Sequence, residues 1–412
     1  YVTYDNNFIE SEWWALKQIW DKGLLYKGFK IVPYCPRCGT TLYAQEVAQG
    51  YKDVKERSAI VRFKVKDEDA YILAWTTTPW TLPSNLALCV NPKEDYAKVK
   101  AADGRVYYMA CALLDTVLGR LAEEGKDAYE VLATYKGTEL EGKEYEPLYQ
   151  CAADEAAKQR KKAFYVVCDE YVTLTDGTGV VHLAPAFGED DARVGRKYDA
   201  PFVQMVDEAG VMKPETPFAG MRAKPTKKEM EAGAINCDVE VLKELEGRGI
   251  LFSAPKVEHE YPHCWRCDTP LIYYARESWF IKMTDPEVKA NLIANNKTIN
   301  WIPETIGTGR FGAWLENVQD WGISRNRYWG TPLNIWVCDD CGEMLSIGSK
   351  AELKEHSDNC PDDIELHRPY IDEAELVLTC TALSATDITM DQMLDAEIEP
   401  KWYADGDLHT MY

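Results

Sequence analysis

The chain has 412 residues, enough for about two or three domains of ordinary size, and 46% of them are hydrophobic, as in globular proteins. The formal charge of −22 argues against a surface that binds polyanions indiscriminately, so nucleic acid would be contacted only through small basic clusters such as residues 224–228 and 325–327. No apolar run approaches the roughly 20 residues of a membrane span, and the sequence opens without a signal-peptide pattern.

The predicted elements begin with a helix over residues 8–23, where apolar side chains recur at helical spacing and Gly23 marks the end. Because Tyr1 stands in place of a methionine at the start of this folded segment, we expect a fragment of a longer protein. A short strand over residues 29–32 follows and runs into Cys35.

Residues 59–186 are β-rich, with a helix predicted over residues 111–124 and strands that read AIVRFKV, YILAWT, LALCV, RVYYMA, FYVVCDEYVTL and GVVHLAPAF. Residues 237–252 predict a further helix and strand, and mixed α/β character returns after Cys267. A mainly β domain is therefore predicted as an insertion between two outer segments of similar character.

The stretch WTTTPWTLPSN, residues 75–85, places three threonines at the end of a predicted buried strand. Three β-branched hydroxyls there form either a stiff, hydrogen-bonded corner or a row of small donors and acceptors that lines a pocket. Threonine is common at strand ends, so these residues alone favour the structural corner.

Three Cys-x-x-Cys pairs predict zinc knuckles rather than disulfides, because the acidic, untargeted chain has the character of an intracellular protein. Cys35 with Cys38 and Cys264 with Cys267 flank the β-rich segment, and together they would complete a closed, structural four-cysteine zinc site. The third knuckle is Cys338 with Cys341. Its partner is open, with Cys380 and Cys360 as single candidates for a second, uncertain zinc site.

Two further motif matches are rejected. His259-Glu-Tyr-Pro-His263 fits H-E-x-x-H, but that zinc-protease motif needs a continuous helix, which Pro262 would break. Residues 307–312 fit G-x-G-x-x-G, but no strand precedes them and no acidic residue follows at the required distance. We expect a turn that leads into a helix at Trp314.

Several longer stretches closely resemble the isoleucyl-tRNA synthetases, a family of class I aminoacyl-tRNA synthetases. They are YVTYDNNFIESEWWALKQIWDKGLLYKGFKIVPYCPRCGTTL, AWTTTPWTLPSN, GTGVVHLAPAFGEDD, YPHCWRCDTPLIYYARESWF and ENVQDWGISRNRYWGTPL. The resemblance runs from residue 1 to about residue 372. The related valyl and leucyl enzymes characteristically read Thr-Thr-Arg-Pro-Glu-Thr at the threonine stretch, whereas this chain has the isoleucyl form, Thr-Thr-Thr-Pro-Trp-Thr.

The resemblance implies an α/β fold in which Rossmann-type class I synthetase core segments are interrupted by a β-rich editing domain, with zinc knuckles at the junction. The implied domains are a catalytic-core segment (1–34), a zinc knuckle (35–54), the inserted editing domain (55–258), a second knuckle (259–275), the catalytic-core return (276–337) and a third knuckle region with a divergent tail (338–412). In the full enzyme, ATP and Mg²⁺ would serve the charging of tRNA(Ile) with isoleucine.

The sequence departs from the family pattern in two places. The two ATP signatures of the class, His-Ile-Gly-His-like and Lys-Met-Ser-Lys-Ser-like, are absent, and the pattern is lost from Leu376 onward. A fourth knuckle is missing there, as are residues that would line the isoleucine pocket. We therefore expect that this chain alone does not aminoacylate.

The resemblance also implies an editing site that hydrolyses mischarged Val-tRNA(Ile). Asp191 would anchor the substrate ammonium, Thr77 and Thr78 would supply hydroxyls, and His182 would form part of a wall that excludes isoleucine. The supporting residues would be Thr76, Thr81 and Asn85. Without the resemblance, His182 is more typical of a satisfied core histidine, and Asp190 and Asp191 of helix caps.

Two other functions stay open: a stand-alone deacylase that clears mischarged tRNA in trans, and a non-catalytic, zinc-stapled tRNA-binding module. The expected partners are tRNA(Ile), with isoleucine and valine as cognate and edited amino acids, and no membrane. We expect a cytoplasmic monomer.

Overall fold

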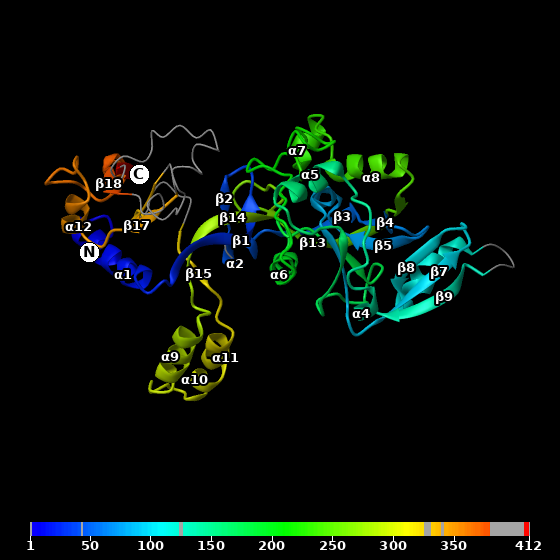
Figure 1. The fold of residues 1–412 in the computed structure, drawn as a ribbon, viewed down its shortest axis with the longest axis horizontal. Coiled ribbons are helices and arrows are strands. Elements are labelled where there is room, and N and C mark those ends of the chain that lie inside the picture. Colours follow the sequence, from blue (N-terminus) through cyan, green and yellow to red (C-terminus); the bar gives the residue numbers. More distant parts are fainter. Residues whose placement is uncertain are drawn as a thin grey trace, which may run out of the picture. The chain divides into compact units, whose positions relative to one another are not determined.

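The computed structural model describes residues 2–42, 44–122, 127–324, 331–338 and 342–379, and a strand over 408–411 (Figure 1). The chain divides into two compact units, which are described separately. Unit 1 comprises Tyr1–Phe29 and Glu277–Tyr412, and unit 2 comprises Lys30–Arg276. Within the described ranges, no helix combines the length and apolar character that crossing a membrane requires.

Unit 1 begins with helix α1 (Asn6–Trp20), which confirms the helix predicted from apolar spacing. Asp5 caps it, since its carboxylate accepts the N–H of Asn7 at 2.9 Å. The helix buries Trp13, whose ring meets that of Trp336 edge-on with centroids 5.7 Å apart. The remaining elements of unit 1 are β14 (Ile272–Ile281, which enters it from unit 2), α9 (Pro286–Asn296), α10 (Thr305–Thr308), α11 (Arg310–Glu316), β15 (Trp321–Gly322), β16 (Ile335–Val337), β17 (Met344–Ser346), α12 (Lys350–Glu355), the 3₁₀ helix η4 (Tyr370–Glu373), β18 (Leu376–Thr379) and β19 (Leu408–Met411).

Unit 2 is built on a nine-stranded mixed sheet. Its main path runs in the order β10-β6-β11-β5-β8-β7-β9, and β4 joins β5 to β12. The strands are β4 (Ala59–Lys64), β5 (Tyr71–Thr76), β6 (Ala87–Val90), β7 (Asp95–Ala101), β8 (Val106–Ala110), β9 (Tyr129–Lys136), β10 (Tyr165–Cys168), β11 (Val180–Leu183) and β12 (Leu251–Ser253).

Two smaller strand pairs complete unit 2. Strand β1 (Leu25–Cys35), which begins in unit 1 and continues into unit 2 from Lys30, pairs antiparallel with β2 (Thr40–Thr41) around the first cysteine knuckle, and it is longer than the predicted 29–32. Strand β3 (Tyr51–Arg57) pairs antiparallel with β13 (Lys256–Pro262), so the beginning and the end of the β-rich segment form one ribbon.

In Figure 1, helices α5, α7 and α8 lie on one side of strands β4 and β5, and α6 lies on the other. The helices of unit 2 are α2 (Ala44–Val47), α3 (Leu114–Leu118), α4 (Gly137–Leu140), α5 (Gln150–Lys158), α6 (Glu189–Lys197), α7 (Lys227–Glu231) and α8 (Cys237–Gly247), with a 3₁₀ helix, η1 (Pro79–Ser84), after β5. Helix α8 and strand β12 confirm the helix and strand predicted over residues 237–252.

Strands β5 and β11 determine where the candidate site lies. They are parallel neighbours in which Val181 is paired with Trp75. Because parallel strands end at the same edge of a sheet, the threonines after Trp75 and the segment after His182 emerge side by side. Strand β6 is antiparallel to β11 on its other side and pairs Leu88 with His182, so Asn85 lies at the same edge.

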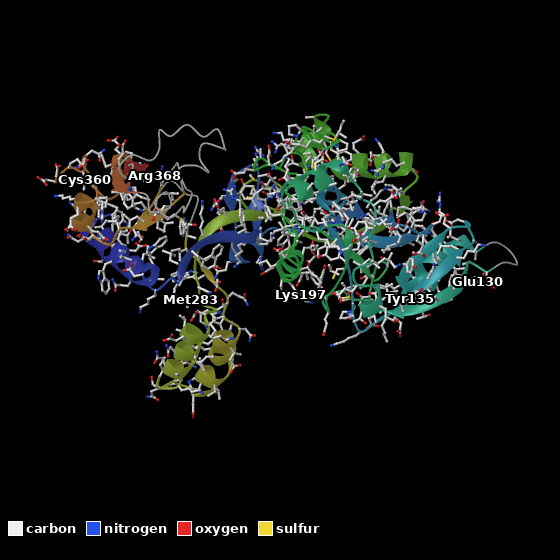
Figure 2. All side chains as sticks on the ribbon, in the orientation of Figure 1. Glu130, Tyr135, Lys197, Met283, Cys360 and Arg368 are labelled. Carbon is white, nitrogen blue, oxygen red and sulfur yellow. The ribbon has the colours of Figure 1, made fainter. Side chains whose placement is uncertain are left out.

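Two predictions of secondary structure need correction, and one strand was missed. The helix predicted over 111–124 is only five residues long, α3, and is flanked by 3₁₀ turns at Cys111–Leu113 and Gly119–Leu121. The segment FYVVCDEYVTL forms a strand only over β10. Strand β9 was not predicted, because as an edge strand it leaves most side chains exposed, among them Glu130 (Figure 2).

Candidate functional site

Thr76, Thr78 and Thr81 form a hydrogen-bonded corner and a row of hydroxyls at once. The N–H of Thr78 donates to Thr76 Oγ1 at 3.1 Å, and the Thr78 hydroxyl lies 3.3 Å from those of Thr76 and Thr81. The Thr81 hydroxyl donates to the carbonyl of Thr78 at 2.8 Å. Thr77 stands between Thr76 and Thr78 in the sequence and is half-buried. The two interpretations of WTTT are therefore compatible.

His182 is buried against this row and is held at both ring nitrogens. Its Nε2 lies 2.8 Å from Thr81 Oγ1, and its Nδ1 lies 3.4 Å from Asn85 Nδ2. The orientation of the Asn85 amide follows from its other partners, since Tyr145 donates to Oδ1 at 2.7 Å and Nδ2 donates to the Ala87 carbonyl at 3.0 Å. The amide therefore donates to Nδ1, so Nε2 carries the proton and donates to Thr81.

This histidine is neutral at physiological pH. Burial lowers the pKa of His182 to about 4, because the charged imidazolium would lose its hydration. A neutral ring whose two nitrogens are already bonded has no free acceptor for a proton of water. His182 is thus suited to a steric role and not to that of a general base.

Asp191 lies in the first turn of α6 and reaches back to the end of β11. Its Oδ2 accepts the N–H of Ala184 at 2.9 Å, and its Oδ1 accepts the Tyr171 hydroxyl at 3.3 Å. A carboxylate has about four lone-pair sites, so these two donors leave acceptor capacity for a cationic ligand. Desolvation raises the pKa of Asp191 to about 6 in spite of both hydrogen bonds.

The expectation that Asp190 or Asp191 caps the following helix is wrong. Gly188 occupies the N-cap position of α6, and Asp190 forms an ion pair with Arg193 at 3.0 Å. Trp80, in the same threonine stretch, packs edge-on against Phe187 with ring centroids 5.0 Å apart.

The first two knuckles converge on one point. The sulfur of Cys267 lies 3.5 Å from that of Cys35 and 3.4 Å from that of Cys38, and Cys38 lies 4.0 Å from Cys264. A tetrahedron of about 2.3 Å zinc–sulfur bonds has edges of about 3.8 Å, so these spacings fit a zinc ion. Each turn is closed by a residue with positive φ, Gly39 at 62° and Asp268 at 62°.

The two described ends of the third knuckle, Cys338 and Gly342, match those of the first, but the described part of the chain holds no complete ligand set there. The N–H of Gly342 donates to the Cys338 carbonyl at 2.9 Å, and the φ of Gly342 is 71°. Cys341 and Cys380 lie outside the described residues. Among the residues that are described, only the group of Cys35, Cys38, Cys264 and Cys267 could hold a metal ion, and Cys360 does not belong to it.

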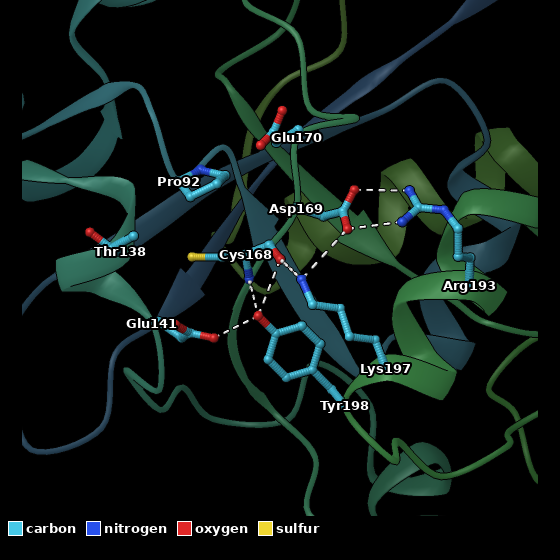
Figure 3. Close-up of a pocket in the computed structure, with 9 residues that line it drawn as sticks. All are labelled: Pro92, Thr138, Glu141, Cys168, Asp169, Glu170, Arg193, Lys197 and Tyr198. Carbon is cyan, nitrogen blue, oxygen red and sulfur yellow. Dashed lines mark hydrogen bonds and ion pairs between the residues drawn. The ribbon is translucent and has the colours of Figure 1, made fainter.

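A cavity of about 600 Å³ lies elsewhere on unit 2 (Figure 3). Four of its polar side chains are paired with one another: Arg193 donates to both oxygens of Asp169 at 2.8 and 2.9 Å, and Tyr198 donates to Glu141 at 2.6 Å. Arg193 and Asp191 stand two positions apart on α6 and therefore face different directions. The cavity contains none of the predicted site residues. Its lining consists of Pro92, Thr138, Glu141, Cys168, Asp169, Glu170, Arg193, Lys197 and Tyr198.

Two tyrosines of the site could not be found from the sequence. Tyr145 and Tyr171 contact Asn85 and Asp191 through their hydroxyls, from segments 60 and 20 residues away. No local pattern signals such contacts, since Tyr171 was placed on a predicted strand and Tyr145 in no motif.

The rejected motifs and one basic cluster have clear structural positions. His259 lies on strand β13, so the H-E-x-x-H match is not helical and its rejection is confirmed. Gly307 lies in the short helix α10, where a Cβ would come within 2.1 Å of Trp301, so this glycine serves packing. The basic cluster at residues 224–228 was expected to be able to contact nucleic acid. Its first member, Lys224, is instead buried and ion-paired with Asp238, so it is not available for such a contact. Residues 325–327 lie outside the described part of the chain.

The family model described as tRNA synthetases class I (I, L, M and V) matches residues 1–382. An isoleucine–tRNA ligase of Clostridium acetobutylicum is 51% identical over 410 residues, which cover 99% of this chain and 36% of that protein. The corresponding ligase of Bacillus thuringiensis (strain Al Hakam) is 44% identical with the same coverage. The chain thus spans about a third of the length of the curated relatives it matches.

Among solved structures, the editing domain of the P. knowlesi cytosolic leucyl-tRNA synthetase matches 38% of this chain and 66% of that chain, at 19% identity and a TM-score of 0.25. A TM-score this low supports no conclusion about the fold. The assignment therefore rests on the family model, which covers most of the chain and agrees with the close sequence relatives. The chain belongs to the class I tRNA synthetase family.

Proposed function

We propose that this chain is part of an isoleucine–tRNA ligase and that its unit 2 carries the site that hydrolyses mischarged Val-tRNA(Ile). One observation carries the proposal: neutral hydroxyls and a neutral buried histidine lie where β5 and β11 end, and a partly free carboxylate accepts the N–H of Ala184 directly after β11. The whole enzyme would charge tRNA(Ile) with the use of ATP and Mg²⁺. We assign residues 55–258 to the editing domain.

The need for a second site follows from binding energetics. One missing methylene changes binding by only about 1–3 kcal/mol, and discrimination of isoleucine from valine by this class of enzyme is the standard illustration. A synthetic pocket therefore admits valine too often. A separate site that accepts valine, excludes isoleucine and hydrolyses the ester removes the error.

The site residues suit the three parts of that task. Asp191 would bind the ammonium of the misattached valine, because its carboxylate keeps acceptor capacity and is partly desolvated. The hydroxyls of Thr77 and Thr78 would orient the ribose and the attacking water. The ring of His182 would close the side-chain pocket, and Thr76, Thr81 and Asn85 would hold these groups in place.

The chemistry needs positioning more than a strong base. An aminoacyl ester is an activated bond, so an oriented water that attacks its carbonyl carbon can expel the ribose hydroxyl without a dedicated general base. The engaged nitrogens of His182 are consistent with this mechanism. The threonine hydroxyls carry no charge that would have to be desolvated when the substrate enters.

Zinc would have a structural role here. Four thiolates from Cys35, Cys38, Cys264 and Cys267 close the coordination shell and leave no open position for a substrate or water. The ion would hold together the points where the chain enters and leaves the editing domain. Zinc chemistry at the ester is therefore not part of the proposed mechanism.

Deacylation of Val-tRNA(Ile) by this chain tests the proposal, with Thr78→Val as the diagnostic variant. Valine keeps the shape of threonine and removes only the hydroxyl, so we expect a loss of about 5- to 30-fold, typical of one hydrogen bond. Thr134→Val, on the exposed face of edge strand β9, is the matched control and should deacylate like the parent. Equal rates for both variants would contradict the assignment.

A further inference from the structure

The 3₁₀ helix η1 begins with one backbone donor that its own residues do not satisfy. Thr78 is the N-cap residue, Pro79 has no N–H, and the N–H of Thr81 donates to the Thr78 carbonyl at 3.0 Å. This leaves the N–H of Trp80, at the second helical position. A threonine at the N-cap usually accepts that proton with its side-chain oxygen, but Thr78 makes no such bond.

Asp238 supplies the missing acceptor from a distant part of the chain. Its Oδ1 accepts the N–H of Trp80 at 3.0 Å, although it belongs to the first turn of helix α8. Its other oxygen lies 2.9 Å from Lys224 Nζ, which also lies 2.7 Å from Glu56 on ribbon strand β3. Asp238 and Lys224 are each only 6% exposed, so this ion pair is internal, whereas the Glu56 side chain is 25% exposed.

The charge state of this ion pair follows from its geometry. Burial raises the pKa of Asp238, which favours a neutral acid, whereas the pKa of Lys224 is raised because the carboxylates outweigh its own burial. The raised pKa of Asp238 thus favours an uncharged pair, and the raised pKa of Lys224 favours a charged one. Because Nζ contacts two carboxylates within 3 Å, we assign the charged state, in which Lys224 holds Asp238 in place.

We propose that Asp238, held by Lys224, is a positioning residue for the deacylation site: it caps η1 in place of Thr78 and so leaves the Thr78 hydroxyl free for the row of threonines. This inference rests on the proposed deacylase function. Without an acceptor at position 238, Thr78 is the residue placed to accept the N–H of Trp80. Its hydroxyl would then turn away from Thr76 and Thr81, and the site would lose one of its oriented groups.

The test compares two double variants of the full chain that differ only in the acceptor. Asp238→Asn with Lys224→Met removes both charges but keeps a side-chain oxygen for Trp80. Asp238→Leu with Lys224→Met has nearly the same shape and removes the oxygen as well. Replacing a buried ion pair by neutral residues of similar volume is often neutral for stability, and the Glu56 carboxylate, which loses its lysine partner in both variants, is 25% exposed and stays hydrated, so both variants should fold.

We expect the asparagine variant to deacylate Val-tRNA(Ile) within about threefold of the parent. The leucine variant should lose about 5- to 30-fold in kcat, in line with one lost cap, with KM changed less than about twofold. Equal kcat values for two variants with the same thermal unfolding midpoint would overturn the inference.

A double-mutant cycle with Thr78→Val separates this inference from the function on which it rests. If Asp238 acts through the Thr78 hydroxyl, adding Thr78→Val to the leucine variant costs nothing further. Additive losses would overturn the inference and leave the deacylase intact, whereas no effect of Thr78→Val in the parent would overturn the deacylase assignment itself.

If the leucine variant does not fold, hydrogen exchange at the Trp80 amide in the asparagine variant, Asp238→Asn with Lys224→Met, decides the question. A protected amide with near-parental deacylation, or rapid exchange with reduced deacylation, supports the inference. Rapid exchange with undiminished deacylation overturns it, as does a protected amide with deacylation lost.

Discussion

The substitution Asp191→Asn separates the contribution of Asp191 to deacylation from its effect on the stability of the fold. Asparagine keeps the shape of the side chain, can accept the N–H of Ala184 and can donate to the Tyr171 hydroxyl. Only the negative charge is removed. A charge-assisted contact of this kind is worth about 1.5–3 kcal/mol, so loss of the ammonium anchor should slow deacylation of Val-tRNA(Ile) by about 10- to 150-fold.

The same substitution should stabilise the fold at neutral pH. A carboxyl whose pKa is raised from 3.8 to about 6 stabilises the native state only while it is protonated, and this contribution is lost as the pH rises from about 4 to about 6. At pH 7 the carboxyl is ionised, and its desolvation then lowers the free energy of unfolding by about 3 kcal/mol. The asparagine variant avoids it, so its free energy of unfolding should exceed that of the parent at pH 7, and the gain should vanish near pH 4.

Urea unfolding at pH 7 and pH 4 measures the stability, and deacylation of Val-tRNA(Ile) measures the function. Asp190→Asn is the matched control, because Asp190 is the exposed neighbouring acid and should leave deacylation unchanged. A variant of Asp191 that is less active and also less stable at pH 7 would refute the reasoning about its burial. One that deacylates Val-tRNA(Ile) as fast as the parent would show that Asp191 is not the ammonium anchor.

Three further predictions concern the metal centre and the histidine. Cys264→Ser should lower the zinc content by about one ion per chain, because three thiolates cannot close a tetrahedral structural site; unchanged metal analysis would contradict the assignment. His182→Ala should widen the pocket and allow hydrolysis of Ile-tRNA(Ile), and unchanged discrimination between Val-tRNA and Ile-tRNA would argue against a steric wall. Since burial lowers the pKa of His182 to about 4, its neutral ring stabilises the fold above pH 6.5, and about 3 kcal/mol is lost as the pH falls from 6.5 to 4. His182→Gln should lack this loss in urea unfolding at the two pH values, and an equal loss in both proteins would refute it.

Local signals in the sequence predicted those features that depend on near neighbours. The knuckles follow from the spacing of cysteines with a turn residue behind them, and α1 and α8 from apolar periodicity. Edge strand β9 escaped prediction because its side chains are mostly exposed, so alternation between a buried and an exposed face is weak. The helix after Cys111 was overestimated, since only Leu114–Leu118 is α-helical and 3₁₀ turns adjoin it on both sides.

The site could be predicted only in part for the same reason. Thr76, Thr78 and Thr81 lie within one short segment, and their mutual hydrogen bonds were foreseeable as a corner. The partners of His182 and Asp191 come from other segments, and only the family resemblance had brought these residues together. Asp238 contacts Trp80 across 158 positions of sequence, a distance at which periodicity and spacing carry no information.

The convergence of the Cys35–Cys38 and Cys264–Cys267 knuckles determines how unit 2 tolerates insertions and deletions. The sulfurs of Cys38 and Cys264 lie 4.0 Å apart although 226 positions separate them, so the segment between them is a closed loop. The entropy of closing such a loop grows with the logarithm of its length, and each doubling costs only about 0.6 kcal/mol. Insertions or deletions far from the cysteines therefore change the closure term very little. An element could be added to the surface of this segment, or removed from it, without lengthening the gap that the four sulfurs bridge.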